Sequence, residues 1–468
     1  MKLVYNVSDR PPLAKNLVYA LQQLLAVLAA TILVPAIING KIEAAGMSQA
    51  AALFGAGVGT LVYLCFTKFK SPVFLGSSFA FIGPMLSAFA GALAVGMSGY
   101  LGLIIGAVFA GLVYVVLALI VKKAGTAWIA KVMPMTVIGP TVAIIGLSLA
   151  GNAIGSVMTG NASIEANYSG DLSAYIFSGN TAVGITCGLV ALFATIIASV
   201  YGSKNIKLIP FIIGIGAGYV VATIFTVIGY IAKDTSLQIV AFEKFGQMTW
   251  DPGFTFVKSL GDFKNFNFAY LGTIAIAYIP VAFVVFAEHL ADHKNISSII
   301  GTDLLADPGL DRTLLGDGIG SMAGAFFGGC PNTTYGESIG CVAITRNASV
   351  STIMISALMC IVLAFFAPFV TFIATIPPCV INGVCIALYG FIAVSGLKML
   401  QKVNLEDNGN LFTVSTILVA GVGQFALAFQ VNATQYITLT EIACALILGM
   451  LVNLVVTAFK KKETKDEE

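Results

Sequence analysis

The chain alternates long apolar runs with short polar segments along almost its whole length. About fourteen runs can be distinguished, and most reach the roughly 20 residues that a helix needs to cross the hydrocarbon core of a bilayer. The runs near Ser87, Gly320 and Gly340 are the weakest, because glycine and proline shorten or interrupt them. This pattern predicts an all-α polytopic membrane protein with 14 transmembrane segments.

The lysines and arginines support an even number of segments. With both chain ends on the cytoplasmic side, all but five of the 24 basic residues fall on that side, as the positive-inside rule requires. Four of the five lie in one loop, 233–267, and long loops follow the rule less strictly. A missed or additional segment would invert every later loop, so we expect both termini in the cytoplasm.

Composition agrees with this topology. Hydrophobic residues make up 58% of the chain and charged residues only 10%, whereas soluble domains carry about 25% charged residues. The eight cysteines form no CxxC pair, which disfavours a disulfide framework or a metal cage. We therefore expect a protein of the cell membrane, surrounded by the lipid bilayer, with no cofactor and no nucleic-acid partner.

Two pairs of similar segments indicate an internal repeat. Residues 134–139 (PMTVIG) match 378–383 (PCVING) at an offset of 244 residues, and 77–81 (SSFAF) resembles 333–337 (TTYGE). Seven segments per half is an odd number, so the second half must enter the membrane from the opposite side. The sequence thus predicts a 7+7 inverted repeat, which is typical of secondary transporters.

The second pair of segments also interrupts its helices. Glycine, proline and hydroxyl residues crowd 75–84 and 328–336, and these residue types favour turns or extended backbone. Non-helical backbone at membrane depth is tolerated only when protein covers it or when it lines a cavity. Two breaks in corresponding halves point to a transport site. The alternative is a pair of ordinary polar loops at the membrane surface.

Few acidic residues fall inside the apolar segments. Glu288 ends the run 279–287, and Glu337 follows the second break. A carboxylate at the bilayer centre costs roughly 2.5–3.5 kcal/mol on insertion scales, so both are functional candidates. Asp317 and Glu441 are equally compatible with surface or capping roles.

The two histidines, His289 and His293, are four residues apart and share one helix face. Zinc would need a third ligand, and no HExxH order is present, so a metal site is disfavoured. Asp292 is four residues after Glu288 and shares a face with it.

Three segments resemble signatures of the nucleobase–ascorbate transporters, in their bacterial uracil permease branch: 75–81 (LGSSFAF), 287–289 (AEH) and 331–337 (PNTTYGE). The resemblance implies short antiparallel strands in segments 3 and 10, and a core domain that moves like an elevator against a gate domain. The gate would also form a homodimer. The implied bounds are 1–123 and 268–374 for the core, 124–232 and 375–459 for the gate, 233–267 for an extracellular loop, and 460–468 for a charged cytoplasmic tail.

The resemblance also implies a binding site. Glu288 and Glu337 would hold the base, with Phe79 and Tyr335 beside it and Tyr389 facing it from the gate. Ser78 and Gly336, at the two breaks, complete the predicted site. The chain departs from the family pattern at three places: Asp292 stands where uracil permeases have histidine, with His293 one residue later; Ser338 replaces asparagine; and Gln22-Gln23 replaces a Gln-His pair.

These groups suit a flat, neutral base such as uracil, which offers two ring N–H donors and two carbonyl acceptors. Carboxylates accept from the N–H groups, and Phe79 can stack on the ring for about 1–3 kcal/mol. A poorly hydrated carboxylate also binds a proton readily. We therefore expect import of uracil, or a close pyrimidine, by proton symport, with Glu288, Asp292 and His293 in proton coupling.

Other functions remain open at this point. A purine or xanthine permease would use the same architecture, and so would an anion transporter, although a buried pair of acids disfavours an anion. A channel could not accumulate substrate. An enzyme is disfavoured because no nucleophile–base constellation lies near the breaks.

Overall fold

The computed structural model describes residues 2–42, 45–159, 168–169, 172–173, 179–265, 268–401, 403–432 and 435–466. The first part of the chain contains α1 (Leu13–Lys41), α2 (Gln49–Phe66), β1 (Leu75–Ser77), the 3₁₀ turn η2 (Phe79–Phe81), α3 (Ile82–Ala94), α4 (Tyr100–Ala124), α5 (Ile129–Val132), α6 (Met135–Ser148), α7 (Ala150–Thr159), β2 (Tyr168–Ser169), β3 (Leu172–Ser173), α8 (Gly179–Tyr201), η3 (Ile206–Leu208) and α9 (Pro210–Ala232).

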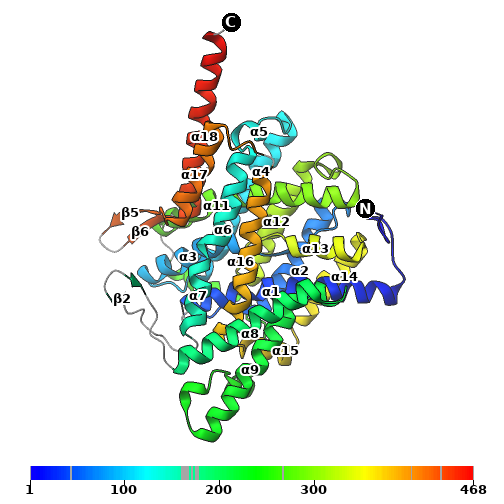
Figure 1. The fold of residues 1–468 in the computed structure, drawn as a ribbon, viewed down its shortest axis with the longest axis vertical. Coiled ribbons are helices and arrows are strands. Elements are labelled where there is room, and N and C mark those ends of the chain that lie inside the picture. The colour runs from blue at the N-terminus through cyan, green and yellow to red at the C-terminus, as the bar shows by residue number, and fades with distance from the viewer. Residues whose placement is uncertain are drawn as a thin grey trace.

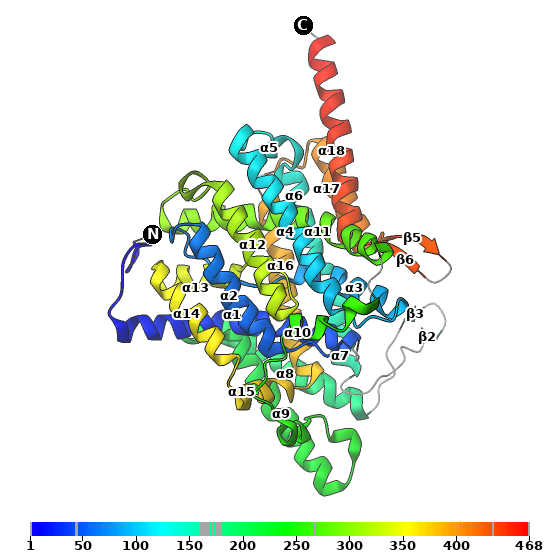
Figure 2. The same cartoon turned by 180° about the vertical axis from the view of Figure 1, so that it is seen from behind.

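The loop that follows contains η4 (Thr235–Leu237), η5 (Phe242–Gln247), α10 (Thr255–Ser259) and η6 (Asp262–Asn265). The last part contains α11 (Phe268–Ile300), the π turn η7 (Leu305–Gly309), α12 (Leu310–Gly328), β4 (Asn332–Thr334), α13 (Gly336–Thr345), α14 (Val350–Leu363), α15 (Ala367–Ala374), α16 (Pro378–Leu400), α17 (Asn408–Val422), β5 (Leu427–Asn432), β6 (Gln435–Leu439) and α18 (Glu441–Asp466). The end of α18 projects beyond the rest of the molecule in both views (Figures 1 and 2).

The helices are those of a multi-pass membrane protein. Within the described ranges, nine helices are long and apolar enough to cross a bilayer, and α14 with α15, bent by 80° at their junction, would make ten. Other apolar segments are shorter, such as 79–93 and α17. Segment 79–93 contains the weak run near Ser87 that the sequence indicates, whereas α17 is not one of the weak runs.

The helices form two packing groups. In the first, α12 packs along α2 and α4, α11 packs on α4, and α14 packs on α1 and α2. In the second, α16 packs along α6, α7 and α8, with α9 on α8 and α17 between α6 and α18. Figure 1 shows α16 running beside α6.

Small residues allow α2 and α12 to cross closely. A methyl group added at Gly55 or Gly328 would collide with backbone atoms of the facing helix, and one at Gly59 or Gly320 would also do so. Close approach through glycine is how membrane helices gain packing contacts that lipid cannot replace. This crossing forms the frame on which β1 and β4 rest.

The β-structure consists of three two-stranded pairs in the described part of the chain. Strands β1 and β4 pair antiparallel, with Leu75 opposite Thr334, Gly76 opposite Thr333 and Ser77 opposite Asn332. Strands β5 and β6 form a hairpin before α18, and sequence analysis missed it because the alternation of its residues is hidden among apolar ones.

Candidate functional site

The two interrupted segments meet at the β1–β4 pair. Beyond the strands, the Ser78 amide donates to the carbonyl of Pro331 (2.9 Å), and the Tyr335 amide donates to that of Phe74 (3.2 Å). Each strand leads directly into a helix, β1 into η2 and α3, and β4 into α13. The first amides of a helix lack partners within the helix, so both helix starts are suited to a carbonyl or an anion.

Side chains from three helices hold the strand pair in place. The Thr60 hydroxyl accepts from the Leu75 amide (2.9 Å), and the Asn332 side-chain amide donates to the Gly55 carbonyl (3.0 Å). The Ser338 hydroxyl accepts from the Phe74 amide (3.0 Å) and from the Gln23 side chain (2.5 Å). Two of the positions that depart from the family pattern, Gln23 and Ser338, thus bind each other and fix the start of α13.

A cavity of about 370 Å³ lies beside this crossing and is walled by both packing groups. On the side of the first group the walls come from α1 and α11 together with η2, β4 and α13, and on the side of the second from α6, α8, α9 and α16 together with η3. Residues that line the cavity are Ala26, Phe79, Ala80, Val142, Ile145, Ser199, Lys207, Leu208, Pro210, Phe211, Glu288, Ala291, Asp292, Asn295, Thr333, Thr334, Tyr335, Gly336, Glu337, Gly340, Cys341, Ile344, Phe391, Ile392, Ser395 and Met399.

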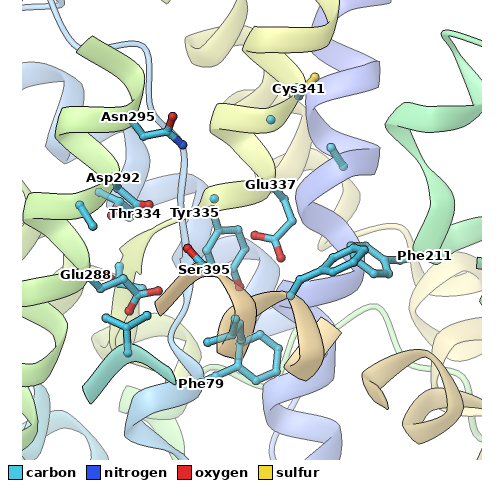
Figure 3. A pocket seen from close by; sticks show the side chains of 18 of the residues that line it. Phe79, Phe211, Glu288, Asp292, Asn295, Thr334, Tyr335, Glu337, Cys341 and Ser395 are labelled. Atoms are coloured by element: carbon cyan, nitrogen blue, oxygen red, sulfur yellow. Dashed lines mark hydrogen bonds between the residues drawn. The ribbon is translucent and has the colours of Figure 1, made fainter. Parts of the chain in front are cut away.

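Acidic side chains enter the cavity from two helices (Figure 3). Glu288, Asp292 and Asn295 lie one turn apart on a single face of α11, as helical spacing predicts. Glu337 belongs to the first turn of α13 and approaches from the other side of Tyr335. The Thr334 hydroxyl donates to the Asp292 carboxylate at 2.7 Å, which ties α11 to β4.

Aromatic rings shape the remaining walls. Phe79 meets Tyr389 edge to face, with ring centroids 5.8 Å apart, and so joins the first packing group to α16. The Tyr335 hydroxyl donates to the Ser77 carbonyl (2.8 Å), which holds its ring across the strand pair. Phe211 and Phe391 form a second edge-to-face pair, 6.0 Å apart, on the opposite wall.

Six of the predicted site residues line this cavity: Phe79, Glu288, Asp292, Tyr335, Gly336 and Glu337. Ser78 is buried next to it, and its hydroxyl has no partner among the described residues. Tyr389 reaches the cavity only through its contact with Phe79. Glu441 begins α18 and lies outside the cavity wall.

His293, predicted to take part in proton coupling, is not among the residues that line the cavity and lies on another face of α11. It is fully buried, and its Nε2 is 2.7 Å from the Tyr63 hydroxyl. Its neighbour His289 is equally buried and contacts Asp317 instead of solvent. The one-residue shift from position 292 to 293 rotates a side chain by about 100° around the helix, which removes His293 from the wall. No cluster of potential metal ligands occurs in the parts of the chain that the structure describes.

Several wall residues escaped sequence analysis. Thr333, Lys207, Ser395 and Phe211 carry no motif that distinguishes them from loop or packing residues. Thr333 is 2% exposed, and its hydroxyl lacks a partner within the described ranges. Its position in the Thr-Thr-Tyr segment was the one available signal.

A mostly helical membrane protein with two interrupted segments and an acid-lined cavity between two packing groups is a membrane transporter. A family model described as "Permease family" matches residues 14–430, and the chain belongs to this family. This confirms the resemblance seen in the sequence and places the protein among transporters rather than enzymes.

Curated relatives cover nearly the whole chain. The uracil permease of Bacillus caldolyticus is 37% identical over 97% of this chain and 95% of that protein. The uracil permease of Bacillus subtilis (strain 168) is 34% identical over 100% of this chain and 98% of that protein. That of Escherichia coli (strain K12) is 34% identical over 96% and 93%.

Solved structures share the fold. The transmembrane domain of the cyanobacterial bicarbonate transporter BicA superposes with a TM-score of 0.58 at 18% identity, covering 95% of this chain and 98% of that one. The murine Solute Carrier 26 family member A9 anion transporter, in an inward-facing state, gives 0.56 at 11% identity, covering 97% and 69%. At these identities the likeness concerns the fold alone.

Proposed function

We propose that this protein imports uracil, or a close pyrimidine base, by proton symport. The observation that supports this most directly is the position of Glu288 and Glu337 on facing walls of one cavity, with Phe79 and Tyr335 between them. The curated relatives named above are uracil permeases, and the cavity supplies the groups that such a base requires.

The two carboxylates are free to bind a base. Within the described ranges, neither Glu288 nor Glu337 forms an ion pair with a basic side chain. Each can therefore accept a hydrogen bond from a ring N–H, while the amides at the starts of η2 and α13 donate to the ring carbonyls. Phe79 supplies a face for stacking, and the unpartnered Thr333 hydroxyl supplies a further polar contact.

Proton coupling is proposed to use the same cavity. Glu288, Asp292 and Glu337 place three carboxylates around one space, an arrangement that is costly while all three are charged and partly desolvated. Binding of a proton with the neutral base relieves this cost and links the two solutes. Asp292 takes the place of the family's histidine in this scheme. We propose H⁺ as the coupling ion and no bound cofactor.

The transport movement is proposed to follow the two packing groups. Fourteen segments result when β1 with α3, α6 with α7, and β4 with α13 each count as one, together with α1, α2, α4, α8, α9, α11, α12, α14, α16, α17 and α18. These form two inverted sevens with the core (1–123, 268–374) and gate (124–232, 375–459) bounds given above. The core slides along the gate, the gate forms a homodimer, and both termini face the cytoplasm of a cell membrane.

Uptake of radiolabelled uracil into proteoliposomes tests this function. An inward proton gradient is expected to drive accumulation, a sodium gradient alone to leave the label at equilibrium, and an uncoupler to release it. Excess unlabelled uracil should compete, whereas xanthine and bicarbonate should not. Accumulation that follows sodium, or competition by xanthine instead of uracil, would contradict the proposal.

A single methyl group at Gly76 is expected to weaken binding. The ring of Tyr335 occupies the space that a Cβ at residue 76 would take, so Gly76→Ala must displace the ring from the cavity wall. Overpacking of this kind costs roughly 1–3 kcal/mol, which corresponds to an affinity for uracil lower by about five- to 150-fold if the whole cost falls on binding. Titration of the purified protein with uracil measures it. Gly216→Ala in α9, where nothing lies within 4 Å, is the matched control and should bind normally.

A further inference from the structure

Behind the cavity, the two histidines of α11 lie inside the first packing group. His289 Nδ1 is 2.6 Å from Asp317 Oδ2, and His289 Nε2 is 3.0 Å from the Thr313 hydroxyl. His289 is 0% exposed and Asp317 is 1% exposed, and both Asp317 and Thr313 belong to α12. None of these three residues lines the cavity described above.

The hydrogen bonds of His293 define its protonation. Its Nδ1 is 2.8 Å from the His289 carbonyl, which can only accept, so Nδ1 carries hydrogen. Its Nε2 can then accept from the Tyr63 hydroxyl, which is also 2.6 Å from the Ser71 hydroxyl. His293 stacks on His289 with ring centroids 3.9 Å apart, and two stacked cations would repel each other. Within the described ranges His293 forms no ion pair with an acidic side chain that would compensate a positive charge, so we infer that its imidazole is neutral.

The number of protons that the hydrogen bonds require is different for His289. The Thr313 hydroxyl donates its single hydrogen to the Leu310 carbonyl (3.1 Å), so His289 Nε2 must itself be the donor to Thr313. The contact between His289 Nδ1 and Asp317 then needs one more proton, since two lone pairs would otherwise face each other. Wherever that proton resides, the pair carries no net charge.

The alternative hydrogen-bond arrangement, with Thr313 as the donor to His289, would destabilise the folded protein. If Thr313 donated to His289 instead, a neutral imidazole would face an ionised Asp317, leaving one negative charge buried. Within the described ranges, the only ion pairs are Lys70 with Asp307 and this histidine–aspartate pair, so no basic residue would compensate Asp317. An uncompensated buried charge is strongly destabilising, and the net-neutral arrangement avoids it.

We propose that His289 and Asp317 hold one proton as a net-neutral pair, and that this pair positions the cavity face of α11. His289 follows Glu288 directly, so its bond to α12 fixes the rotation of α11 that turns Glu288 and Asp292 toward the cavity. His289 and Asp317 are thus positioning residues, and the proton that they hold is distinct from one carried by the cavity acids.

A second, small cavity of about 10 Å³ has Asp317 as one of its lining residues. It is lined by Tyr114, Ser321 and Asn332, among others, and the Tyr114 hydroxyl is buried without a partner among the described residues. This space suits one water molecule, which needs about 10–15 Å³ and two or more polar partners. A water there would bind the hydroxyl and the carboxyl group without adding charge to the pair.

Nitrogen NMR of the ¹⁵N-histidine-labelled full-length protein tests the proton count, because the chain has only two histidines. We expect one neutral imidazole with hydrogen on Nδ1 alone, and one ring that carries hydrogen on Nε2. His293→Gln should remove the first signal set and so assign both. A wild-type spectrum in which both rings have a bare Nε2 would overturn the proposal, and this readout requires neither a foldable Asp317 variant nor any assumption about the substrate.

The positioning role has its own test. Asp317→Asn keeps a hydrogen-bond partner for His289 Nδ1, whereas Asp317→Leu removes it. We expect Asp317→Leu to bind uracil at least tenfold more weakly than Asp317→Asn, and Asp317→Asn to leave the His289 ring neutral with hydrogen on Nε2. Exposed Asp303→Asn is the control and should match the wild type in both readouts. Equal affinities of the two Asp317 variants would reject the positioning role, and the NMR result would still decide the proton count. Should wild-type protein fail to bind uracil, the proposed function would fail without affecting that count.

Discussion

Glu288→Gln is expected to abolish accumulation of uracil against its gradient. The Glu288 carboxylate lines the cavity, forms no ion pair with a described basic residue, and faces the wall that carries Glu337. A glutamine has nearly the same shape, but it cannot take up a proton, and its neutral oxygen is a weaker acceptor. The hydrogen bond to the base is therefore weakened, and the coupling is lost.

The size of the binding defect follows from the hydrogen bond. A hydrogen bond to a charged group contributes about 1.5–3 kcal/mol and one to a neutral group about 0.5–1.5 kcal/mol, so affinity should fall by roughly fivefold to tenfold. Uptake driven by a proton gradient in proteoliposomes measures coupling, and titration of the purified variant measures affinity. Glu406→Gln, which changes an exposed acid in the loop before α17, should transport like the wild type.

A counterflow experiment distinguishes the loss of proton coupling from the loss of uracil binding. Exchange of labelled for unlabelled uracil at saturating concentration needs no net proton movement, so Glu288→Gln should retain slow exchange while losing accumulation. If the variant accumulated uracil to the wild-type level, Glu288 could not be the coupling acid. In that event Asp292, one turn along the same face and bound to Thr334, would be the next candidate.

Local sequence signals identified residues at the centre of the cavity. Glycine, proline and hydroxyl residues marked the two breaks, and helical spacing put Glu288 and Asp292 on one face of α11. Both signals are local, since they depend on residues within one or two turns of the chain. The same reasoning could not tell which face of α11 meets the cavity, because that depends on where α12 packs. His293, predicted to take part in proton coupling, lies behind the cavity wall beside Tyr63, and its part in coupling stays a prediction.

Contacts between segments that are distant in the chain could not be predicted from the sequence. Asp317 gave no indication of its bond to His289, which requires α11 and α12 to lie side by side, and a capping role seemed equally suitable. Residues of the second packing group, such as Phe211 and Ser395, meet the cavity only because the two groups face each other. Ser338 and Gln23 each departed from the family pattern, and only their mutual contact explains how both changes fit.

Gly324→Val is expected to prevent stable folding, because the crossing of α2 and α12 leaves no room for a larger side chain. A Cβ at residue 324 would overlap the Asn332 side chain, whose Oδ1 lies 2.9 Å from that position. Asn332 is the residue of β4 that binds the Gly55 carbonyl, and it has no room to withdraw because it is 2% exposed. The added volume must therefore separate the helices or expel the strand pair.

Separating the helices or expelling the strand pair should lower the free energy of unfolding by more than the roughly 1–3 kcal/mol typical of overpacking. The reason is that backbone atoms of α2 also contact α12 here. We expect most of the Gly324→Val protein to aggregate on extraction, and any folded remainder to melt well below the wild type and to bind no uracil. Size-exclusion chromatography and thermal unfolding in detergent measure this. Gly272→Val in α11, where a Cβ meets nothing within 4 Å, should behave like the wild type. A stable Gly324→Val variant that bound uracil normally would contradict this prediction. It would show that neither the β1–β4 pair nor the cavity depends on the close contact between Gly324 and Asn332.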